Sequence, residues 1–292
     1  MRKLFLTLVM LTVFGFVQAQ TFKFSVGYAV PWISQQIGVN SSSTSVTTFN
    51  SNTGAQSSES KSTHRDVRGS YGAGLTLSGS FGYRFSQHVG IELGLAYLQG
   101  KKINTTSTYS DTQSDVLKNA GSESETSFSK GVFFTPSLKF IASERKLTPY
   151  MLIGPVVGKV KFNREMNRTL EEDGLQSSEY RYTKYSGGLS LGIRGGVGVT
   201  LKVNSKVSLF SEVIFTGMNY YPKQSEISRY TINGEEKLST LTTHVRETIY
   251  QKKVVFNSNE VDDAINYPGK SVRFPVAMSS ITTSAGVYIN LQ

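Results

Sequence analysis

Apolar side chains recur at every second position in eight stretches of this sequence, with small or polar residues between them. In residues 187–203, GGLSLGIRGGVGVTLKV, Leu191 and Ile193 share one phase and Arg194 lies in the other. A period of two is that of a β-strand, whose successive side chains point to opposite faces. An all-β fold of eight strands is therefore predicted, with rows at residues 22–30, 71–85, 89–97, 132–140, 150–162, 189–203, 207–215 and 281–291.

The connections between the rows alternate between two classes of length. Short ones lie near residues 86–88, 143–148 and 204–206, and long ones lie near residues 34–69, 100–128, 163–182 and 218–272. Outer-membrane barrels have tight periplasmic turns and longer extracellular loops, whereas a soluble β-sandwich has no reason to sort its loops by length to opposite ends. The pattern predicts an eight-stranded antiparallel transmembrane β-barrel with long extracellular loops.

Residues 1–19 have the layout of a secretory signal peptide. Arg2 and Lys3 precede a continuous apolar run, and the small residue Ala19 ends the segment. An N-terminal membrane anchor is the alternative, but the run is shorter than the roughly 20 residues that a spanning helix needs. We therefore expect residues 20–292 to form one β-barrel domain in the outer membrane of a Gram-negative bacterium.

The charge of the chain bears on its partners. The formal net charge is +10, and loss of the two signal-peptide cations lowers it to +8. Export makes anionic lipid headgroups or polysaccharide the expected counter-charges, and nucleic acid is not expected. Cysteine is absent from the sequence, so no disulfide holds this exported fold.

Charged residues occupy the polar phase of several rows. In a membrane barrel the apolar phase faces lipid, so this polar phase points into the lumen. The set comprises Lys23, Arg84, Glu92, Lys139, Lys159, Lys161, Arg194, Lys202 and Glu212. Because an isolated buried ion is costly, we expect Glu92 and Glu212 to bridge Arg194, Lys139 or Arg84. The alternative is a small passive pore with a cationic lumen, lined by Lys139, Lys159 and Arg194.

The long connections carry the other predictions. Residues 34–69 are rich in serine and threonine, so we expect them to be a mobile loop without a core. Asp173-Gly174 predicts a turn, and Asn233-Gly234 predicts a hairpin that extends beyond the membrane. This hairpin could bind a protein partner by strand addition, with Asn233, Gly234, His244 and Arg246 as candidate residues. It could also merely shield the barrel mouth, or join the wall and make a ten-stranded barrel.

Catalytic and metal-binding patterns are weak. The three histidines, His64, His88 and His244, are scattered and lack metal-ligand spacing. A loop-borne surface hydrolase would have to combine His244 with Asp262 or Asp263 and a serine. We therefore predict no enzyme activity, no cofactor and no metal.

The sequence resembles the small outer-membrane barrels of the OmpA and OmpX transmembrane type, in particular the PorT-like barrels. The residues that carry the resemblance are VQAQ at 17–20, the eight rows, and SAGVYINL at 284–291. The resemblance implies a non-catalytic protein in outer-membrane lipid that works within a secretion or uptake assembly. It also implies insertion by the barrel assembly machinery, which reads an aromatic residue at the end of the last strand. Because this chain ends with Leu291-Gln292, Tyr288 would serve as that residue.

Overall fold

The fold is all-β, as the alternation predicts. The computed structural model describes residues 20–32, 35–49, 56–113, 116–142, 145–255 and 265–291, so the predicted signal peptide lies outside the described residues. It contains 17 strands, a 3₁₀ turn η1 (Leu238–Thr240) and a short helix α2 (Thr243–Arg246). Among the described residues, neither helix is long and apolar enough to cross a membrane.

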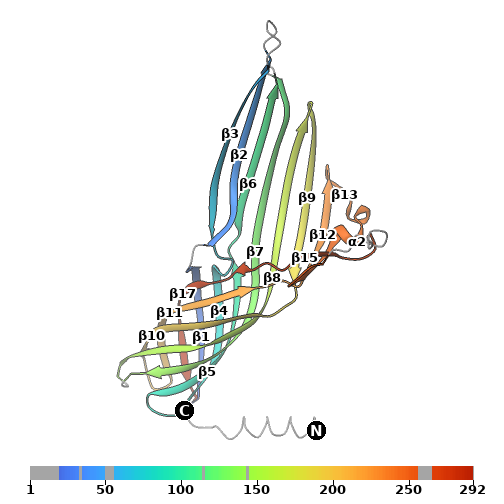
Figure 1. Ribbon diagram of the computed structural model, residues 1–292. Coiled ribbons are helices and arrows are strands. Elements are labelled where there is room, and N and C mark those ends of the chain that lie inside the picture. The colour runs from blue at the N-terminus through green and yellow to red at the C-terminus, as the bar shows by residue number, and fades with distance from the viewer. Residues whose placement is uncertain are drawn as a thin grey trace.

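Eight of the strands pair in a closed antiparallel ring, shown at the base of the molecule in Figure 1. Pairing runs β1 to β4, β5, β7, β8, β10, β11 and β17, and β17 pairs with β1 again. A closed ring leaves no unpaired strand edge. We call it the ring, and its strands are β1 (Gln20–Pro31), β4 (Gly74–Arg84), β5 (Val89–Gly100), β7 (Val116–Ile141), β8 (Leu147–Glu172), β10 (Ser190–Lys202), β11 (Val207–Tyr220) and β17 (Ser280–Asn290).

The short connections all lie at one end of the ring. They join β4 to β5, β7 to β8 and β10 to β11, where the sequence places them. The β10–β11 turn is fixed by Asn204, whose Oδ1 accepts the backbone N–H groups of Lys206 and Val207 at 2.9 and 2.7 Å. The start of β1 and the end of β17 lie at this same end, because Thr21 pairs with Asn290 and the Asn290 N–H donates to Lys206 O in the β10–β11 turn at 2.7 Å.

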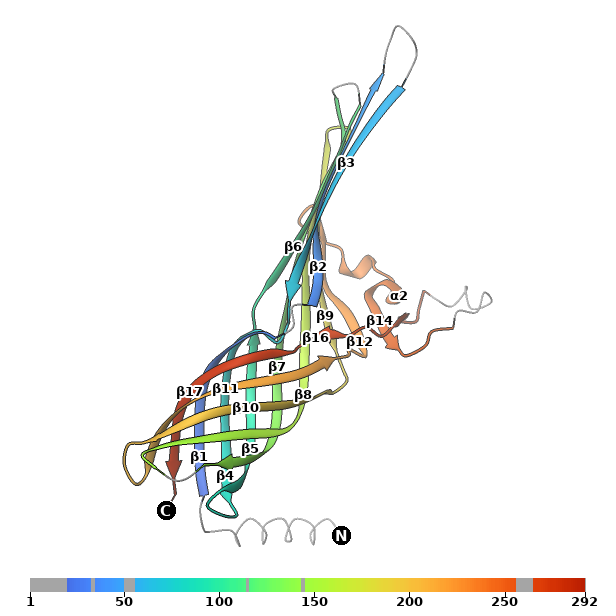
Figure 2. The same cartoon turned by 60° about the vertical axis from the view of Figure 1, so that its left-hand side comes forward.

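At the other end the chain builds a second sheet, which we call the tall sheet. It rises from one side of the ring (Figures 1 and 2). The upper halves of β7 and β8 form its middle. The remaining strands are β2 (Gln35–Phe49), β3 (Gln56–Gly69), β6 (Ile103–Gln113), β9 (Leu175–Ser186), β12 (Gln224–Ile232), β13 (Glu235–Glu236), β14 (Glu247–Gln251) and β15 (Gly269–Val272), while β16 (Val276–Ala277) pairs with β11.

The tall sheet explains why the strand count exceeds the predicted eight. The expectation of a loop without regular structure at residues 34–69 is wrong, because β2 and β3 pair as antiparallel strands over the described residues there. β2 also pairs in parallel with β6, and the hydroxyl of Ser41 donates to that of Ser107 at 3.0 Å. Serine and threonine side chains that cannot form a core still support a strand when neighbouring strands supply the backbone partners.

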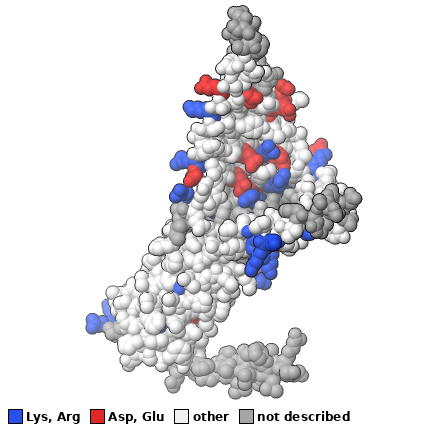
Figure 3. Space-filling view, viewed as in Figure 1, with Lys and Arg blue, Asp and Glu red and all other residues white. Residues whose placement is uncertain are grey.

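The two faces of the ring differ in polarity. The outer face carries apolar side chains, including Leu95 and Ile193, which are 61% and 66% exposed. Charged side chains are almost absent from this wall in Figure 3 and gather above and below it. The inner face carries the buried polar and charged residues, so the ring is apolar outside and polar inside.

In β8 the predicted phase is wrong. Leu152, Val156 and Val160 face the interior, whereas Lys159 and Lys161 are exposed on the outer face. The row was ambiguous because Met151, Ile153 and Val157 give this strand a second apolar phase. Alternation alone cannot orient a strand that is apolar on both sides.

Candidate functional site: the closed lumen and its ion network

A buried ion network, which we call the lumen network, lies inside the ring. The Nζ atom of Lys23 donates to Glu92 Oε1 at 3.1 Å and to Glu212 Oε2 at 2.7 Å. Each of these three side chains is at most 4% exposed. Lys139 adds a second cation, with its Nζ 3.8 Å from Glu92 Oε2. Two ammonium groups therefore balance two carboxylates away from solvent.

Hydroxyl groups complete the coordination of the two carboxylates. Tyr150 and Ser284 donate to Glu212 at 2.9 and 3.1 Å. Tyr288 and Ser80 donate to Glu92 at 3.2 and 3.0 Å. Lys139 Nζ also donates to the Tyr288 hydroxyl at 2.7 Å and lies over both tyrosine rings. Buried charges are tolerated when their remaining hydrogen-bonding positions are filled in this way.

The lumen network connects nearly the whole ring. Its members come from β1, β4, β5, β7, β8, β11 and β17, and Lys23 is 69 and 189 positions away from its two carboxylates. Most of its hydrogen bonds cross the lumen between strands that are not neighbours in the ring, as from Lys23 on β1 to Glu92 on β5 and to Glu212 on β11. The network therefore stabilises one closed arrangement of the strands.

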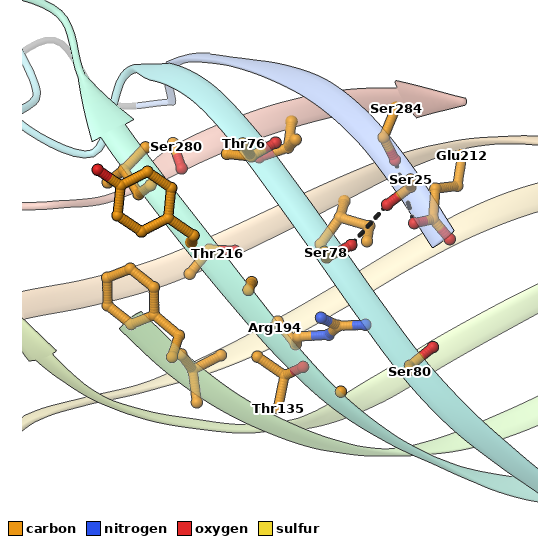
Figure 4. Close-up of a pocket in the computed structure, with 18 of the residues that line it drawn as sticks. Ser25, Thr76, Ser78, Ser80, Thr135, Arg194, Glu212, Thr216, Ser280 and Ser284 are labelled. Carbon is orange, nitrogen blue, oxygen red and sulfur yellow. Dashed lines mark hydrogen bonds between the residues drawn. The ribbon is translucent and has the colours of Figure 1, made fainter. Parts of the chain in front are cut away.

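A cavity of about 90 Å³ adjoins the network, and Lys23, Glu92 and Glu212 help to line it. Figure 4 shows Arg194 projecting into it among serine and threonine side chains. The Nε atom of Arg194 is buried, and among the described residues it has no hydrogen-bond partner. The sequence predicted that Glu92 and Glu212 would bridge Arg194, Lys139 or Arg84. Lys139 does pair with Glu92, but the cation between the two carboxylates is Lys23 and not Arg194.

The end of the lumen next to the tall sheet is filled by apolar side chains. Their cluster comprises Tyr71, Leu98, Phe133, Val156, Val160, Phe162, Tyr185, Met218, Tyr220, Val276 and Met278. The Tyr71 backbone N–H donates to Ala277 O at 2.8 Å, which holds two connecting segments across the mouth. Gly72 is required here, since a Cβ atom on it would lie 1.9 Å from the Met278 carbonyl oxygen. Burial raises the pKa of the Tyr71 phenol, which keeps it neutral.

The opposite end of the lumen is open. A vestibule of about 940 Å³ lies beside the short turns, and Arg84, Lys139 and Lys202 line it. The lumen network and the apolar cluster therefore separate this vestibule from the tall sheet.

The structure brings together part of the predicted lumen set. Glu92, Glu212 and Lys139 belong to one network, Arg194 lines the cavity, and Arg84 lies lower, in the vestibule. Lys159 is outside the ring, which corrects its assignment to the lumen. Lys23 was in the inward set, but its central position was missed because no local pattern shows which charges meet across a ring.

Tyr150 and Tyr288 were also missed as lumen residues. Tyr288 is 5% exposed and points inward, so the terminal aromatic residue inferred from the resemblance lies inside the ring. The signal was present in the sequence, since Tyr288 falls in the phase opposite to Val287 and Ile289.

In the fourth long connection, the described strands β12 to β15 pair outside the ring. β12 pairs with β9, β13 and β14, and β14 pairs in parallel with β15. Asn233 and Gly234 form the predicted turn, with φ values of 51° and 81°. The Oδ1 of Asn233 accepts the Ser178 N–H at 2.7 Å, and Arg246 pairs with Glu247 at 2.8 Å. These candidate partner-binding residues thus have structural contacts within the tall sheet.

The candidate hydrolase residues do not assemble among the residues described. His244 is exposed on α2 and forms no hydrogen bond with a serine or a carboxylate there. Asp262 and Asp263 lie outside the described residues. In the same part of the chain, no group of three potential metal ligands is present.

A closed β-ring with an apolar outer face is the class of structure that these observations define. No family model and no curated protein matches the chain. Among solved structures, the outer membrane protein OprG from Pseudomonas aeruginosa has 11% identity and a TM-score of 0.40, over 94% of this chain and 96% of that one. CarO2 from Acinetobacter baumannii has 16% identity and a TM-score of 0.32, over 92% and 99%. The outer membrane protease OmpT from Escherichia coli has 6% identity and a TM-score of 0.25, over 94% and 97%.

Proposed function

We propose that this chain is a non-catalytic outer-membrane β-barrel protein. The ring is its eight-stranded transmembrane wall, and the tall sheet is an extracellular platform that binds a protein partner. The observation that carries the proposal is the polarity of the ring, with apolar side chains outside and a buried ion network inside. This is the reverse of a water-soluble barrel and the arrangement that lipid requires.

The dimensions and the aromatic side chains of the ring support a membrane location. Its shorter strands have 11 to 14 residues, and a tilted transmembrane strand needs about 9–11. Near the short turns, Tyr83 packs edge-to-face on Phe85, and at the opposite end Trp32 packs on Phe215. Aromatic rings gather at both interfaces of a membrane.

A partner-binding role fits the sealed lumen better than a pore does. The apolar cluster closes the end of the ring next to the tall sheet and the lumen network spans the ring below it, while many residues of the chain form the tall sheet instead. Its outer strand β3 is exposed along almost its whole length and pairs with β2 alone among the described strands. An unpaired strand edge can accept an added strand from a partner. The resemblance to PorT-like barrels supports a place in a secretion or uptake assembly.

The test is affinity purification of the tagged mature protein from its own outer membrane in mild detergent. The proposal predicts a stoichiometric protein partner, identified by mass spectrometry. Two deletion variants, one lacking residues 35–68 and one lacking residues 224–270, locate the binding strand. A barrel that purifies alone at every detergent strength contradicts the partner-binding role.

A further inference from the structure

Three lysines form a cationic group on the outside of the ring, at the end next to the tall sheet. Lys130 on β7 lies directly opposite Lys161 on β8, and Lys159 is its diagonal neighbour. All three side chains are exposed on the same face. Like charges directly opposite each other destabilise a sheet. We call Lys130, Lys159 and Lys161 the rim lysines.

No acidic side chain neutralises the rim lysines within the described part of the chain, since none of the three takes part in an ion pair there. Glu165 shares their face but lies four positions beyond Lys161 on β8, and it forms no ion pair with a rim lysine. Glu125 pairs with Arg164 at 3.0 Å, on the opposite face of the sheet. Lys184 on β9 is also exposed on the face of the rim lysines, with Glu226 opposite it on β12. The rim lysines thus lack a counter-charge.

The position of the rim lysines along the ring axis indicates which external group could neutralise them. Lys159 lies opposite Val132, and Val132 lies opposite Tyr97, whose exposed ring is part of the apolar outer face. Lys130 and Lys161 lie one step further from the apolar wall. Figure 3 shows basic side chains at the height where the wall meets the tall sheet. In a membrane this is the headgroup level of the outer leaflet, which long lysine side chains reach readily.

We infer that the rim lysines bind the phosphate groups of an outer-leaflet lipid. The inference rests on the proposed membrane location of the ring. An ammonium group is a compact point charge that suits phosphate, and three of them beside an apolar surface fit a ligand with both a phosphate and an acyl chain. Binding also relieves the repulsion between Lys130 and Lys161.

The test is native mass spectrometry of the detergent-solubilised protein, titrated with lipid A that carries two phosphates. The variant replaces the rim lysines (K130Q, K159Q and K161Q), and its control replaces Lys146, Lys202 and Lys206 at the opposite end of the ring. At about 1 kcal/mol for each lysine near an anionic surface, the variant should bind about 100-fold more weakly. The control should bind as the unmodified protein does.

Two further probes identify the source of the phosphate. Lipid A stripped of its phosphates should bind both proteins equally weakly, and inorganic phosphate alone should not displace the intact lipid at millimolar concentration. Equal affinity of the unmodified protein and the rim variant for phosphorylated lipid A would overturn the inference. So would tight binding of the stripped lipid. Insertion of the rim variant into lipid vesicles is measured in parallel. If the variant inserts but the two proteins bind lipid A equally, the lipid-binding inference is wrong while the proposed membrane location stands.

Discussion

Lys23 holds two buried carboxylates at once, which makes it the side chain on which the lumen depends most. Replacing it with methionine leaves Glu92 and Glu212 facing each other without a shared cation. Loss of one partner of a buried ion pair costs about 3–5 kcal/mol. We expect K23M to lower the free energy of unfolding by about that amount in a urea titration of the detergent-solubilised barrel, followed by Trp32 fluorescence.

The matched control is K206M, which removes an exposed lysine in the β10–β11 turn. It should change the free energy of unfolding by less than about 0.5 kcal/mol. Equal stability of K23M and K206M would show that the lumen network does not hold the ring together.

Tyr288 provides a second single-residue prediction. Y288F removes a hydroxyl group that contacts both Glu92 and Lys139, and it leaves the packing of the aromatic side chain unchanged. A buried polar group left without its partner costs about 1–3 kcal/mol. The same urea titration should show this loss for Y288F and almost none for Y28F, whose side chain is 50% exposed on the outer face. Equal effects of the two variants would place Tyr288 outside the network.

At the residue scale, the sequence predicted the inward phase of Glu92, Glu212, Lys139 and Arg194. It could not predict that Lys23 would take both carboxylates, because that depends on how the strands are staggered around the ring. Lys159 was assigned wrongly because its strand has two apolar phases.

The β2–β3 hairpin lies beyond the ring, with Ile37 at its base packed against the apolar cluster. Its pairing partner is β6 in the tall sheet, and no residue of the lumen network lies on it. Replacing residues 35–68 with a short Gly-Ser linker should therefore leave the urea midpoint of the ring unchanged. The ends to be joined are close, since Ala29 of β1 pairs with Gly74 of β4. A fall of more than about 1 kcal/mol in the free energy of unfolding would show that the hairpin supports the ring.

At the element scale, the rows and short turns were predictable from period and spacing. The β-structure of the long connections was not. β2 and β6 pair in parallel although the paired residues are 66 positions apart in the sequence. Neither strand has an apolar face from which it could be predicted. Asp173-Gly174 and Asn233-Gly234 were the exceptions, because their turn chemistry is local.

For the molecule as a whole, the filled lumen predicts the absence of ion flow. After reconstitution into a planar bilayer, the protein should give no more conductance than an empty bilayer, because the apolar cluster seals the end next to the tall sheet. Stable anion-selective channels that change selectivity in R194E would support the pore instead. The control verifies that the protein has inserted, by the heat-dependent gel mobility of the protein recovered from the bilayer lipid. Absence of conductance then shows that the inserted barrel is closed.

The closure of the ring was the most predictable property of the whole molecule, since eight apolar rows, all but that of β8 one-sided, leave few other ways to cover the strand edges. The tall sheet was the least predictable part, because it forms where β7 and β8 continue far beyond the ring and pair with polar strands.

The central claim, that the ring crosses a membrane, is tested most directly by spin labels. The chain has no cysteine, so single cysteines can be introduced at Leu95 on the outer face, Thr135 in the lumen and Ser58 on the tall sheet. In vesicles, the label at Leu95 should be relaxed by oxygen and protected from a water-soluble nickel chelate. The label at Ser58 should be relaxed by nickel, and the label at Thr135 by neither. A Leu95 label as accessible to nickel as that at Ser58 would contradict the claim.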